Sequence, residues 1–242
     1  MSRRRFIADE LQGDVATLTG EHAHHLASVL RVQNGQQFEI AYRGSVRLGT
    51  VQSVSDDHVE FFLAAEITTK SSDVPRVTLI LSIFKFDRME WGIEKSVELG
   101  VSKIIPVITQ RTETHLAKAS GKRVERWRRI AREASQQSRR ALEPVIDEPK
   151  KLKDVLAVIP LDAQKILFAE RDATGPLLDV LHTQTDDIHI AIGPEGGWSD
   201  DELALFRSHH WFFASLGDNI LRAETAVIAA LAVIQAAARN KS

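Results

Sequence analysis

The sequence predicts an α/β protein in which a small β-barrel precedes a larger domain built on a parallel sheet. Up to about residue 70, short apolar stretches alternate with glycines, a pattern typical of the short strands and tight turns of small barrels. From Arg76 onward, longer and nearly continuous apolar stretches alternate with helical patterns, as expected for strands buried on both faces of a parallel sheet. With 242 residues, the chain is long enough for one large or two smaller domains.

The first region is expected to hold five strands and one helix. The helix is predicted over residues 21–31, because Leu26, Val29 and Leu30 recur at helical spacing. The predicted strands are residues 6–8, 15–18, 38–41, 46–48 and 59–63. A polar stretch over residues 68–75 ends in proline and is the predicted linker, so the domains are expected to cover residues 1–72 and 73–242.

The second region is expected to alternate five strands with helices. The predicted strands are residues 77–84, 103–108, 165–169, 188–192 and 212–216. A helix over 88–99 is predicted to open with a capping box of Asp87 and Glu90, and a second capping box, Ser199 with Glu202, predicts a helix of eight to ten residues. A basic helix is predicted over 124–142. The helix over 221–238 is apolar on nearly every side, which places it inside the protein or in a subunit interface.

Composition excludes several classes of site. The chain has no cysteine, so disulfides, thiolate metal sites and cysteine nucleophiles are excluded. The longest apolar run covers the nine residues 226–234 and is too short to cross a bilayer. The basic N-terminus has no hydrophobic stretch behind it, unlike a signal peptide. We therefore expect a cytoplasmic protein with no membrane partner.

Positive charge is concentrated in one segment. The formal net charge of the chain is −2, but residues 118–140 contain nine basic and two acidic residues. Such asymmetry on an otherwise acidic protein predicts a local site for a polyanion. Because so few anions accompany the cations, we expect contact with phosphates rather than ion pairs within the helix.

Two strand-to-helix junctions are candidate ligand sites. After the strand over 188–192, residues 193–197 supply three glycines and lead into the helix capped by Ser199, an arrangement that lets backbone approach a ligand. After the strand over 212–216, Gly217 leads into the apolar helix, but on this stretch alone ordinary capping by its acidic and threonine residues is the favoured interpretation. No two glycines are two residues apart, and the Gly44–Gly49 pair is followed by threonine, so the usual dinucleotide and phosphate motifs are absent.

Three histidines, His22, His24 and His25, lie within four residues. No further acidic or histidine ligand follows at the spacing that a metal site needs, so packing or RNA contact is favoured and no metal is expected.

The sequence resembles the RsmE family of SPOUT (trefoil-knot) methyltransferases, which methylate a uridine of 16S rRNA at N3. The resemblance covers nearly the whole chain, and its most specific parts are the segments 193–197 and 221–226. It is also carried by residues 4–6, 24–31, 94–101, 105–106 and 110–112, by Lys85, and by Gln137-Ser138 with Arg140. Where the family usually has an acidic residue, a glycine and an arginine, this chain has Gln136, Arg139 and Asn219.

The resemblance implies a PUA-like RNA-binding barrel, a C-terminal domain with a deep trefoil knot, and a homodimer. It also implies S-adenosylmethionine as the methyl donor. The expected cofactor-binding residues are Phe168, Ala169, Glu170, Ile192, Gly193, Pro194, Glu195, Gly196, Gly197, Leu216, Gly217, Ile220, Leu221, Arg222, Thr225 and Ala226.

The expected partner is 16S rRNA within the small ribosomal subunit. No DNA partner is expected. The expected RNA contacts are Arg4, Arg5, His25, Arg31, Lys85, Arg88, Arg111, Arg128, Arg132, Gln137 and Arg140. For catalysis, Glu195 or Glu224 is expected to act at N3 of the uracil, while Arg140 or Arg222 faces the base. One alternative is an RNA-binding protein whose donor site has decayed, which Gln136 and Asn219 suggest. The other is an unrelated α/β enzyme that uses a nucleotide, which the missing phosphate motifs disfavour.

Overall fold

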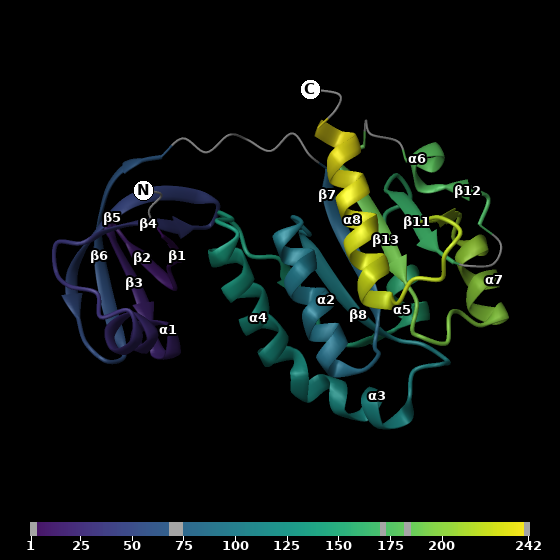
Figure 1. Cartoon of the computed structure of the whole chain (residues 1–242), viewed down its shortest axis with the longest axis horizontal. Coiled ribbons are helices and arrows are strands. Elements are labelled where there is room, and N and C mark those ends of the chain that lie inside the picture. Colours follow the sequence, from purple (N-terminus) through teal and green to yellow (C-terminus); the bar gives the residue numbers. More distant parts are fainter. Residues whose placement is uncertain (1–3, 68–74, 170–172, 182–184, 240–242) are drawn as a thin grey trace. The chain divides into compact units, whose positions relative to one another are not determined.

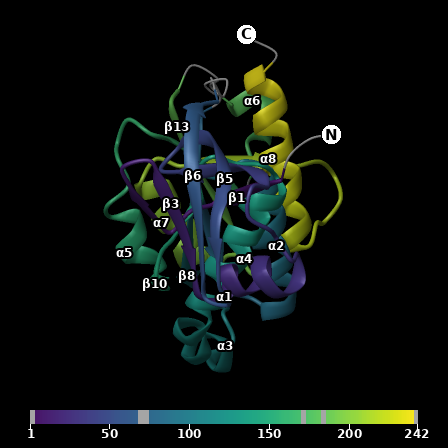
Figure 2. The same ribbon diagram turned by 90° about the vertical axis from the view of Figure 1, so that its left-hand side faces the viewer.

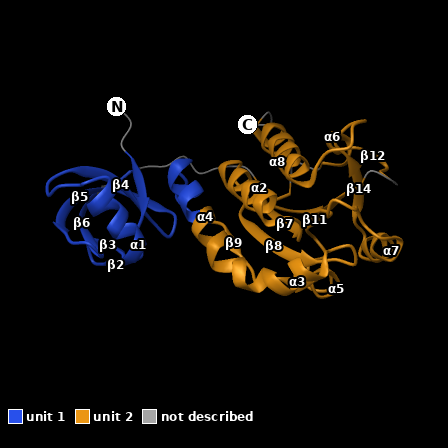
Figure 3. Cartoon of the chain, turned by 60° about the horizontal axis from the view of Figure 1, so that its bottom comes forward, with its two compact units in different colours: residues 1–71, 132–143 blue, residues 72–131, 144–242 orange. Residues whose placement is uncertain are grey.

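A computed structural model describes residues 4–67, 75–169, 173–181 and 185–239. The chain forms two compact units, each with its own sheet. The first contains residues 1–71 together with 132–143, and the second contains residues 72–131 and 144–242 (Figure 3). The predicted fold class, a small β domain followed by an α/β domain, is confirmed.

The first unit is a curled six-stranded sheet with the order β1-β4-β5-β6-β3-β2 (Figures 1 and 2). Its strands are β1 (Arg5–Ile7), β2 (Glu10–Gln12), β3 (Val15–Thr19), β4 (Gln37–Tyr42), β5 (Ser45–Val54) and β6 (His58–Glu66). Only β1 and β4 are parallel; the other neighbours are antiparallel. The five predicted strands are present. Sequence reasoning missed β2, because its three residues include one apolar side chain, that of Leu11, and so show no apolar run or alternating pattern.

The curl of this sheet depends on Gly49. The pairing of β5 with β6 shifts register between Arg47 and Gly49, as in a bulge that bends a strand. A Cβ atom at Gly49 would lie only 2.5 Å from Cγ1 of Ile40. The missing side chain thus lets β4 and β5 close over a core that includes Ile40 and Phe61, both buried.

The predicted helix over residues 21–31 is shorter and changes type. It consists of α1 (Gly20–His24) followed by the π-helical turn η1 (His25–Val29). The amide N–H of Leu30 donates to the carbonyl oxygen of His25 at 3.0 Å, a five-residue step that widens the turn. Sequence periodicity does not distinguish such a turn from an α-helix.

The second unit is built on an eight-stranded sheet in which every pairing is parallel. The strand order is β10-β8-β7-β13-β11-β14-β12, with β9 also beside β8. The strands are β7 (Arg76–Ser82), β8 (Lys103–Ile108), β9 (Val145–Ile146), β10 (Lys150–Lys151), β11 (Gln164–Phe168), β12 (Gly175–Pro176), β13 (Asp187–Ile192) and β14 (Phe212–Ser215). The five predicted strands are adjacent in this order. The three missed strands have two residues each.

Helices cover the sheet of the second unit (Figure 1). They are α2 (Phe86–Glu98), α3 (Thr114–Ser120), the 3₁₀ turn η2 (Gly121–Arg123), α4 (Val124–Gln137), α5 (Leu152–Leu156), α6 (Leu177–Val180), α7 (Asp200–Ser208) and α8 (Ala223–Arg239). Side chains of α5 and α7, including Val155 and Phe206, pack with sheet residues such as Leu167. The helices α2 and α8 contact each other, and α8 also contacts β13.

One predicted capping box is present and the other is not. Ser199 and Glu202 cap α7 reciprocally, as predicted. The helix α2, however, begins at Phe86 without a side-chain cap, one residue before Asp87. The carboxylate of Glu90 instead accepts a hydrogen bond from Arg126 Nε at 2.8 Å, so a distant cation takes the place of the predicted capping contact.

The basic helix ends earlier than predicted, at Gln137 rather than at residue 142. Arg139 has a φ of +59°, in the left-handed region that favours glycine. Its guanidinium donates to Glu39 Oε1 at 2.5 Å, and Arg132 donates to Asp9 Oδ1 at 2.6 Å. These contacts explain why residues 132–143 are grouped with the first unit, so the two compact units do not follow a single cut in the chain.

The apolar helix α8 is buried on one side only. Val227, Leu231 and Ile234 are fully buried, whereas Ala232 and Ala236, on the opposite side, are exposed. Of the two expected places for this helix, the interior of the protein accounts for one side only, and a subunit interface for the other side stays a prediction. No helix in the described ranges is long and apolar enough to span a membrane.

The central strand β13 carries a histidine that should make stability depend on pH. Burial lowers the pKa of His189; Asp187 opposes this, and Lys103 and Lys165 add to it. The folded state disfavours the protonated ring, whereas the unfolded chain takes up the proton near pH 6.5. We therefore expect the free energy of unfolding to fall as the pH drops below 6.5, by up to about 1.4 kcal/mol per pH unit.

Urea unfolding between about pH 5 and pH 8 measures this effect. His189→Leu should show a weaker pH dependence than the unsubstituted protein, because the leucine takes up no proton. Identical slopes for the two proteins would show that His189 does not contribute.

Candidate functional site

Three neighbouring strands of the second unit end at the same edge of the sheet. β11 lies between β13 and β14, and Phe168, the last residue of β11, is opposite Ile192 on one side and Ala214 on the other. The segments that follow these strands therefore meet at one edge. Parallel α/β sheets bind ligands at the carboxyl ends of their strands.

The segment 193–197, which follows β13, is shaped by a tryptophan. Trp198 is buried, and its indole Nε1 donates to the carbonyl oxygen of Phe168 at 3.1 Å. A Cβ atom at Gly193 would lie 3.0 Å from that Nε1 and 3.1 Å from Cε2. Only glycine at 193 leaves the indole room to link the end of β11 to this segment. Trp198 was not among the predicted site residues, although it directly follows the glycine segment.

The second junction joins β14 to α8. Gly217 has a φ of +119°, a conformation that side-chain-bearing residues rarely adopt. The amide N–H of Ala226 donates to the carbonyl oxygen of Arg222 at 2.8 Å, which forms the first turn of the helix. Arg222 and Thr225 are exposed, while Glu224 is buried. The junction thus combines the exposed side chains of Arg222 and Thr225 with the buried carboxylate of Glu224.

Glu224 has an incomplete set of partners. Its Oε1 lies 3.9 Å from Arg88 Nε, and its Oε2 is buried with no hydrogen-bond partner among the described residues. Arg88 lies one turn before Gly92 on α2, where a Cβ atom would be 3.7 Å from Cβ of Glu224. A buried carboxylate oxygen without a donor is costly, so this site favours a ligand that carries a donor or a positive charge.

Two arginines that we expected to contact RNA also hold the glycine segment. Arg88 pairs with the carboxylate of Glu195, and Arg111 donates to the carbonyl oxygen of Gly196. The loop that carries Arg111 is itself held to α7, because the amide N–H of Gln110 donates to Glu202 Oε1 at 2.8 Å. The capping residue Glu202 therefore also positions the arginine beside the segment, a role that sequence spacing does not show.

The structure brings most of the predicted cofactor residues to this edge. Phe168, Ile192 and Pro194 are buried, and Ala169, Gly193, Gly197, Leu216, Leu221 and Ala226 are half-buried. Glu195, Gly196, Gly217, Ile220, Arg222 and Thr225 are exposed. Glu170 lies outside the described residues.

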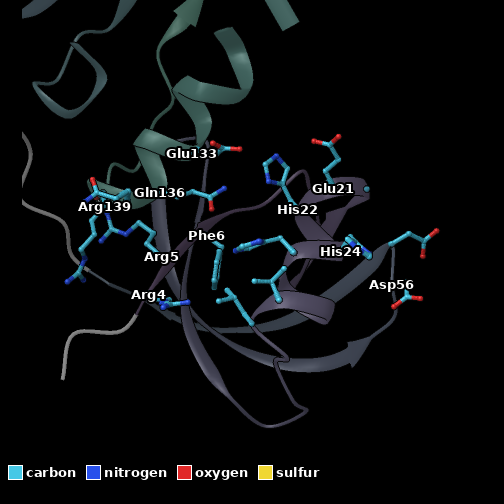
Figure 4. A pocket seen from close by; sticks show the side chains of 16 residues that line it. Arg4, Arg5, Phe6, Glu21, His22, His24, Asp56, Glu133, Gln136 and Arg139 are labelled. Atoms are coloured by element: carbon cyan, nitrogen blue, oxygen red, sulfur yellow. Dashed lines mark hydrogen bonds between the residues drawn. The ribbon is translucent and has the colours of Figure 1, made fainter. Parts of the chain in front are cut away.

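A cavity in the first unit gathers four of the predicted RNA contacts. It has a volume of about 1300 Å³, and Arg4, Arg5, His25 and Gln137 line it (Figure 4). Arg31 is exposed in the same unit, and Arg140 belongs to the same unit and is half-buried. Burial lowers the pKa of the Arg140 guanidinium. Lys85, in the second unit, is exposed immediately before α2. Among the described residues, no group of three or more histidine, aspartate or glutamate side chains could hold a metal ion.

The basic segment makes more ion pairs than the sequence indicated. Three of its partners lie outside the helix: Arg126 pairs with Glu90, Arg128 with Glu148 at 3.2 Å, and Arg132 with Asp9. Within the helix, Arg128 also pairs with Glu125. The expectation concerned ion pairs within the helix, and counting charges within a segment ignores acids that the fold brings to it. Contact of this helix with phosphates stays a prediction.

Arg132 should therefore matter for stability. Its side chain is 16% exposed, and it donates to Asp9 Oδ1 and to the carbonyl oxygen of Ile7, both at 2.6 Å. Burial raises the pKa of nearby Glu143, and Arg132 opposes that rise. We expect Arg132→Gln to lower the free energy of unfolding by about 2 kcal/mol, because it leaves partly buried carboxylates without their cation.

Urea denaturation measures this loss, and Arg128→Gln is the matched control. The Arg128 side chain is 42% exposed, so its replacement should change stability by less than about 0.5 kcal/mol. Equal losses in the two variants would contradict the structural role of Arg132.

Comparisons with known proteins match the regions of the two sheets separately. A family model described as an RNA methyltransferase domain matches residues 70–235, and one described as an RNA methyltransferase PUA domain matches residues 18–63. The ribosomal RNA small subunit methyltransferase E of Synechocystis sp. is 32% identical over 225 residues, which cover 91% of this chain and 72% of that protein. The protein of the same name from Bacillus subtilis is 31% identical over 229 residues, covering 90% and 88%.

Two solved structures resemble the whole chain. Ribosomal RNA small subunit methyltransferase E from Neisseria gonorrhoeae, bound to S-adenosyl methionine, has a TM-score of 0.88 and 30% identity and covers 97% of this chain and 98% of its own. A methyltransferase from Legionella pneumophila, in complex with the bound cofactor SAM, has a TM-score of 0.87 and 30% identity and covers 98% of both chains. The family predicted from the sequence is thus confirmed: this chain belongs to the ribosomal RNA small subunit methyltransferase E family.

Proposed function

We propose that this protein transfers a methyl group from S-adenosylmethionine to N3 of a uridine in small-subunit rRNA. The observation that carries this proposal is the meeting of two glycine-containing junctions, residues 193–197 and 216–226, at the carboxyl edge of a parallel sheet. The relative from Neisseria gonorrhoeae is similar over nearly its whole length and was solved with S-adenosyl methionine bound. The activity of the family therefore fits the geometry of this chain.

The residues at the edge fit this cofactor. S-adenosylmethionine supplies a methyl group on a positively charged sulfur. The buried Oε2 of Glu224, which lacks a donor among the described residues, provides the negative charge that a cationic ligand requires. Backbone of residues 168–169, 193–197 and 216–226 would form the walls, since the glycines of the last two segments allow close approach.

N3 of uracil carries a proton that must leave before the nitrogen can accept a methyl group. Glu195 and Glu224 are the candidate acceptors, and their exposure differs: the side chain of Glu195 is 35% exposed, whereas that of Glu224 is 8% exposed. The uracil of a bound RNA can reach the more exposed carboxylate of Glu195 more easily, so we assign proton acceptance to Glu195. Glu224 then serves the cofactor.

A cation should face the oxygens of the base as charge develops on them. Arg222 is exposed at the start of α8, in the same unit as Glu195, and its guanidinium is suited to stabilise that charge. Arg140, in the other unit, stays a second candidate for this contact. The deep trefoil knot implied by the family resemblance also stays a prediction.

The RNA partner is expected to be 16S rRNA within the small ribosomal subunit, which places the protein's work in the cytoplasm. The region of the PUA match and the adjoining residues 132–143 would hold RNA around the target, while the second unit carries the donor site. A uridine in a single-stranded or loosely paired region exposes N3 with least cost.

A homodimer would cover the exposed side of α8. Ala232 and Ala236 face outward there, and Trp91, on the neighbouring helix α2, is 45% exposed. Exposed apolar side chains on neighbouring helices are typical of subunit interfaces. We expect sedimentation analysis to give a dimer, and Ala232→Arg to shift it toward the monomer. A monomeric unsubstituted protein would contradict the proposed interface.

The proposed function is tested with labelled S-adenosylmethionine and 30S subunits that lack the modification. After incubation, the rRNA is digested and its nucleosides are separated. Label in 3-methyluridine is the expected result. Label in another nucleoside would contradict the assigned position, and no transfer under conditions where the cofactor binds would contradict the activity.

A further inference from the structure

We propose that the cavity of the first unit binds a short unpaired segment of the RNA substrate, with a phosphate at Arg4 and a base at Gln136. This inference rests on the proposed function, because it assumes an RNA substrate. It goes further by assigning a single-strand site at a distinct place in the first unit, separate from the donor site.

The cavity has two chemically different sides. Arg4, Arg5 and Arg139 lie on one side, and His22, His24 and acidic side chains lie on the other (Figure 4). Its volume of about 1300 Å³ exceeds the roughly 300–1,000 Å³ typical of small-molecule sites. A segment of a polymer with a charged backbone and aromatic bases suits both its size and its division of charge.

The arginine side offers one cation for a phosphate and two that are already fixed. Arg5 Nη2 and Arg139 Nη2 donate to the two oxygens of Glu39, at 2.8 Å and 2.5 Å. Burial raises the pKa of Glu39, but hydrogen bonds from Arg139 and Arg5 outweigh that effect and hold the pKa below its usual value. Arg4 is exposed, and its guanidinium has no hydrogen bond or ion pair with the described residues; only its backbone carbonyl oxygen accepts, from the amide N–H of Glu39 at 3.0 Å. Its charge is therefore available to a phosphate.

The cavity also contains an amide that needs an acceptor. Nε2 of Gln136 is buried and has no hydrogen-bond partner among the described residues, and its side chain points into the cavity (Figure 4). A carbonyl oxygen or ring nitrogen of a base would satisfy this donor. Glu133 lies one helical turn earlier and also lines the cavity, so an acceptor for a base N–H lies next to the donor.

The histidines complete a site for an unpaired base. Burial and the neighbouring Arg132 lower the pKa of His22, so its ring is neutral at pH 7. His22 and His25 both line the cavity, and imidazole rings offer flat surfaces on which bases stack. A stacking surface, a donor, an acceptor and a phosphate contact in one concave site are the features by which proteins bind single-stranded RNA.

The test uses the full-length protein and a fluorescein-labelled single-stranded RNA of mixed sequence, with binding followed by fluorescence anisotropy. Gln136→Leu should weaken binding by about three- to tenfold, because the base loses its hydrogen bond. The variant should not lower thermal stability, because it removes a buried donor that lacks a partner. Arg4→Ala should also weaken binding and reduce the slope of log affinity against log salt by about 1.

Gln52→Leu is the matched control, since Gln52 is an exposed residue of the same unit outside the cavity. It should bind RNA like the unsubstituted protein. If both cavity variants also bind like the unsubstituted protein, the cavity does not hold RNA, and the inference falls. Equal weakening by Gln52→Leu would overturn it as well.

The methyl-transfer assay separates this inference from the proposed function. The unsubstituted protein could transfer methyl groups to rRNA while the cavity variants keep their RNA affinity. This result would overturn only the inference that the cavity binds RNA. Absence of methyl transfer would overturn the proposed function, and the binding measurements would still decide whether the cavity binds RNA.

Discussion

Gly193→Val is expected to lower the affinity for S-adenosylmethionine by about a hundredfold. Even a Cβ atom at this position would lie 3.0 Å from Nε1 of Trp198. The indole must then move, and its 3.1 Å hydrogen bond to the carbonyl oxygen of Phe168 is lost. Overpacking of about 1–3 kcal/mol and loss of a hydrogen bond worth about 1 kcal/mol together correspond to this factor.

Isothermal titration calorimetry with S-adenosylmethionine measures the effect. Gly121→Ala is the control, because a Cβ atom there meets nothing within 4 Å and the variant should bind the cofactor normally. Near-normal cofactor affinity in Gly193→Val would show that the segment after β13 does not form the pocket.

Glu195→Gln is expected to reduce turnover by about a hundredfold or more while the affinity for S-adenosylmethionine changes by less than about twofold. The amide keeps the shape of the side chain and can still accept a hydrogen bond from Arg88, its partner in the structure. It cannot take up the proton of N3, and loss of a general base commonly costs this much.

Single-turnover methyl transfer at several pH values tests this role. Glu98→Gln is the control, since Glu98 also pairs with a cation, Lys95 Nζ at 2.8 Å, in the same unit. Glu98→Gln should retain full turnover. Full turnover in Glu195→Gln would transfer the proton-acceptor role to another group, with Glu224 as the next residue to replace.

The main strands and one helix cap could be predicted because each depends on neighbouring residues. Long apolar runs identified the five central strands, and the spacing of Ser199 and Glu202 identified the start of α7. Two-residue strands such as β12 and the π-helical turn η1 have no such signature. The family resemblance added the expected cofactor and donor loops, which periodicity could not supply.

The contacts of the site depended on residues far apart in the chain and could not be read from spacing. Arg88 reaches Glu195 across 107 positions, and Arg111 reaches Gly196 across 85. Burial of Glu224 follows from the packing of α8 against α2 at Gly92. These residues were recognised as functional candidates, but their partners became visible only with the fold.

The most direct test of the account is a crystal structure of this protein with S-adenosylmethionine. We predict that the cofactor lies at the carboxyl ends of β11, β13 and β14, between the segments 193–197 and 216–226, with Glu224 nearby. A cofactor bound elsewhere, or no binding at millimolar concentration, would contradict the assignment of the donor site and of the activity built on it.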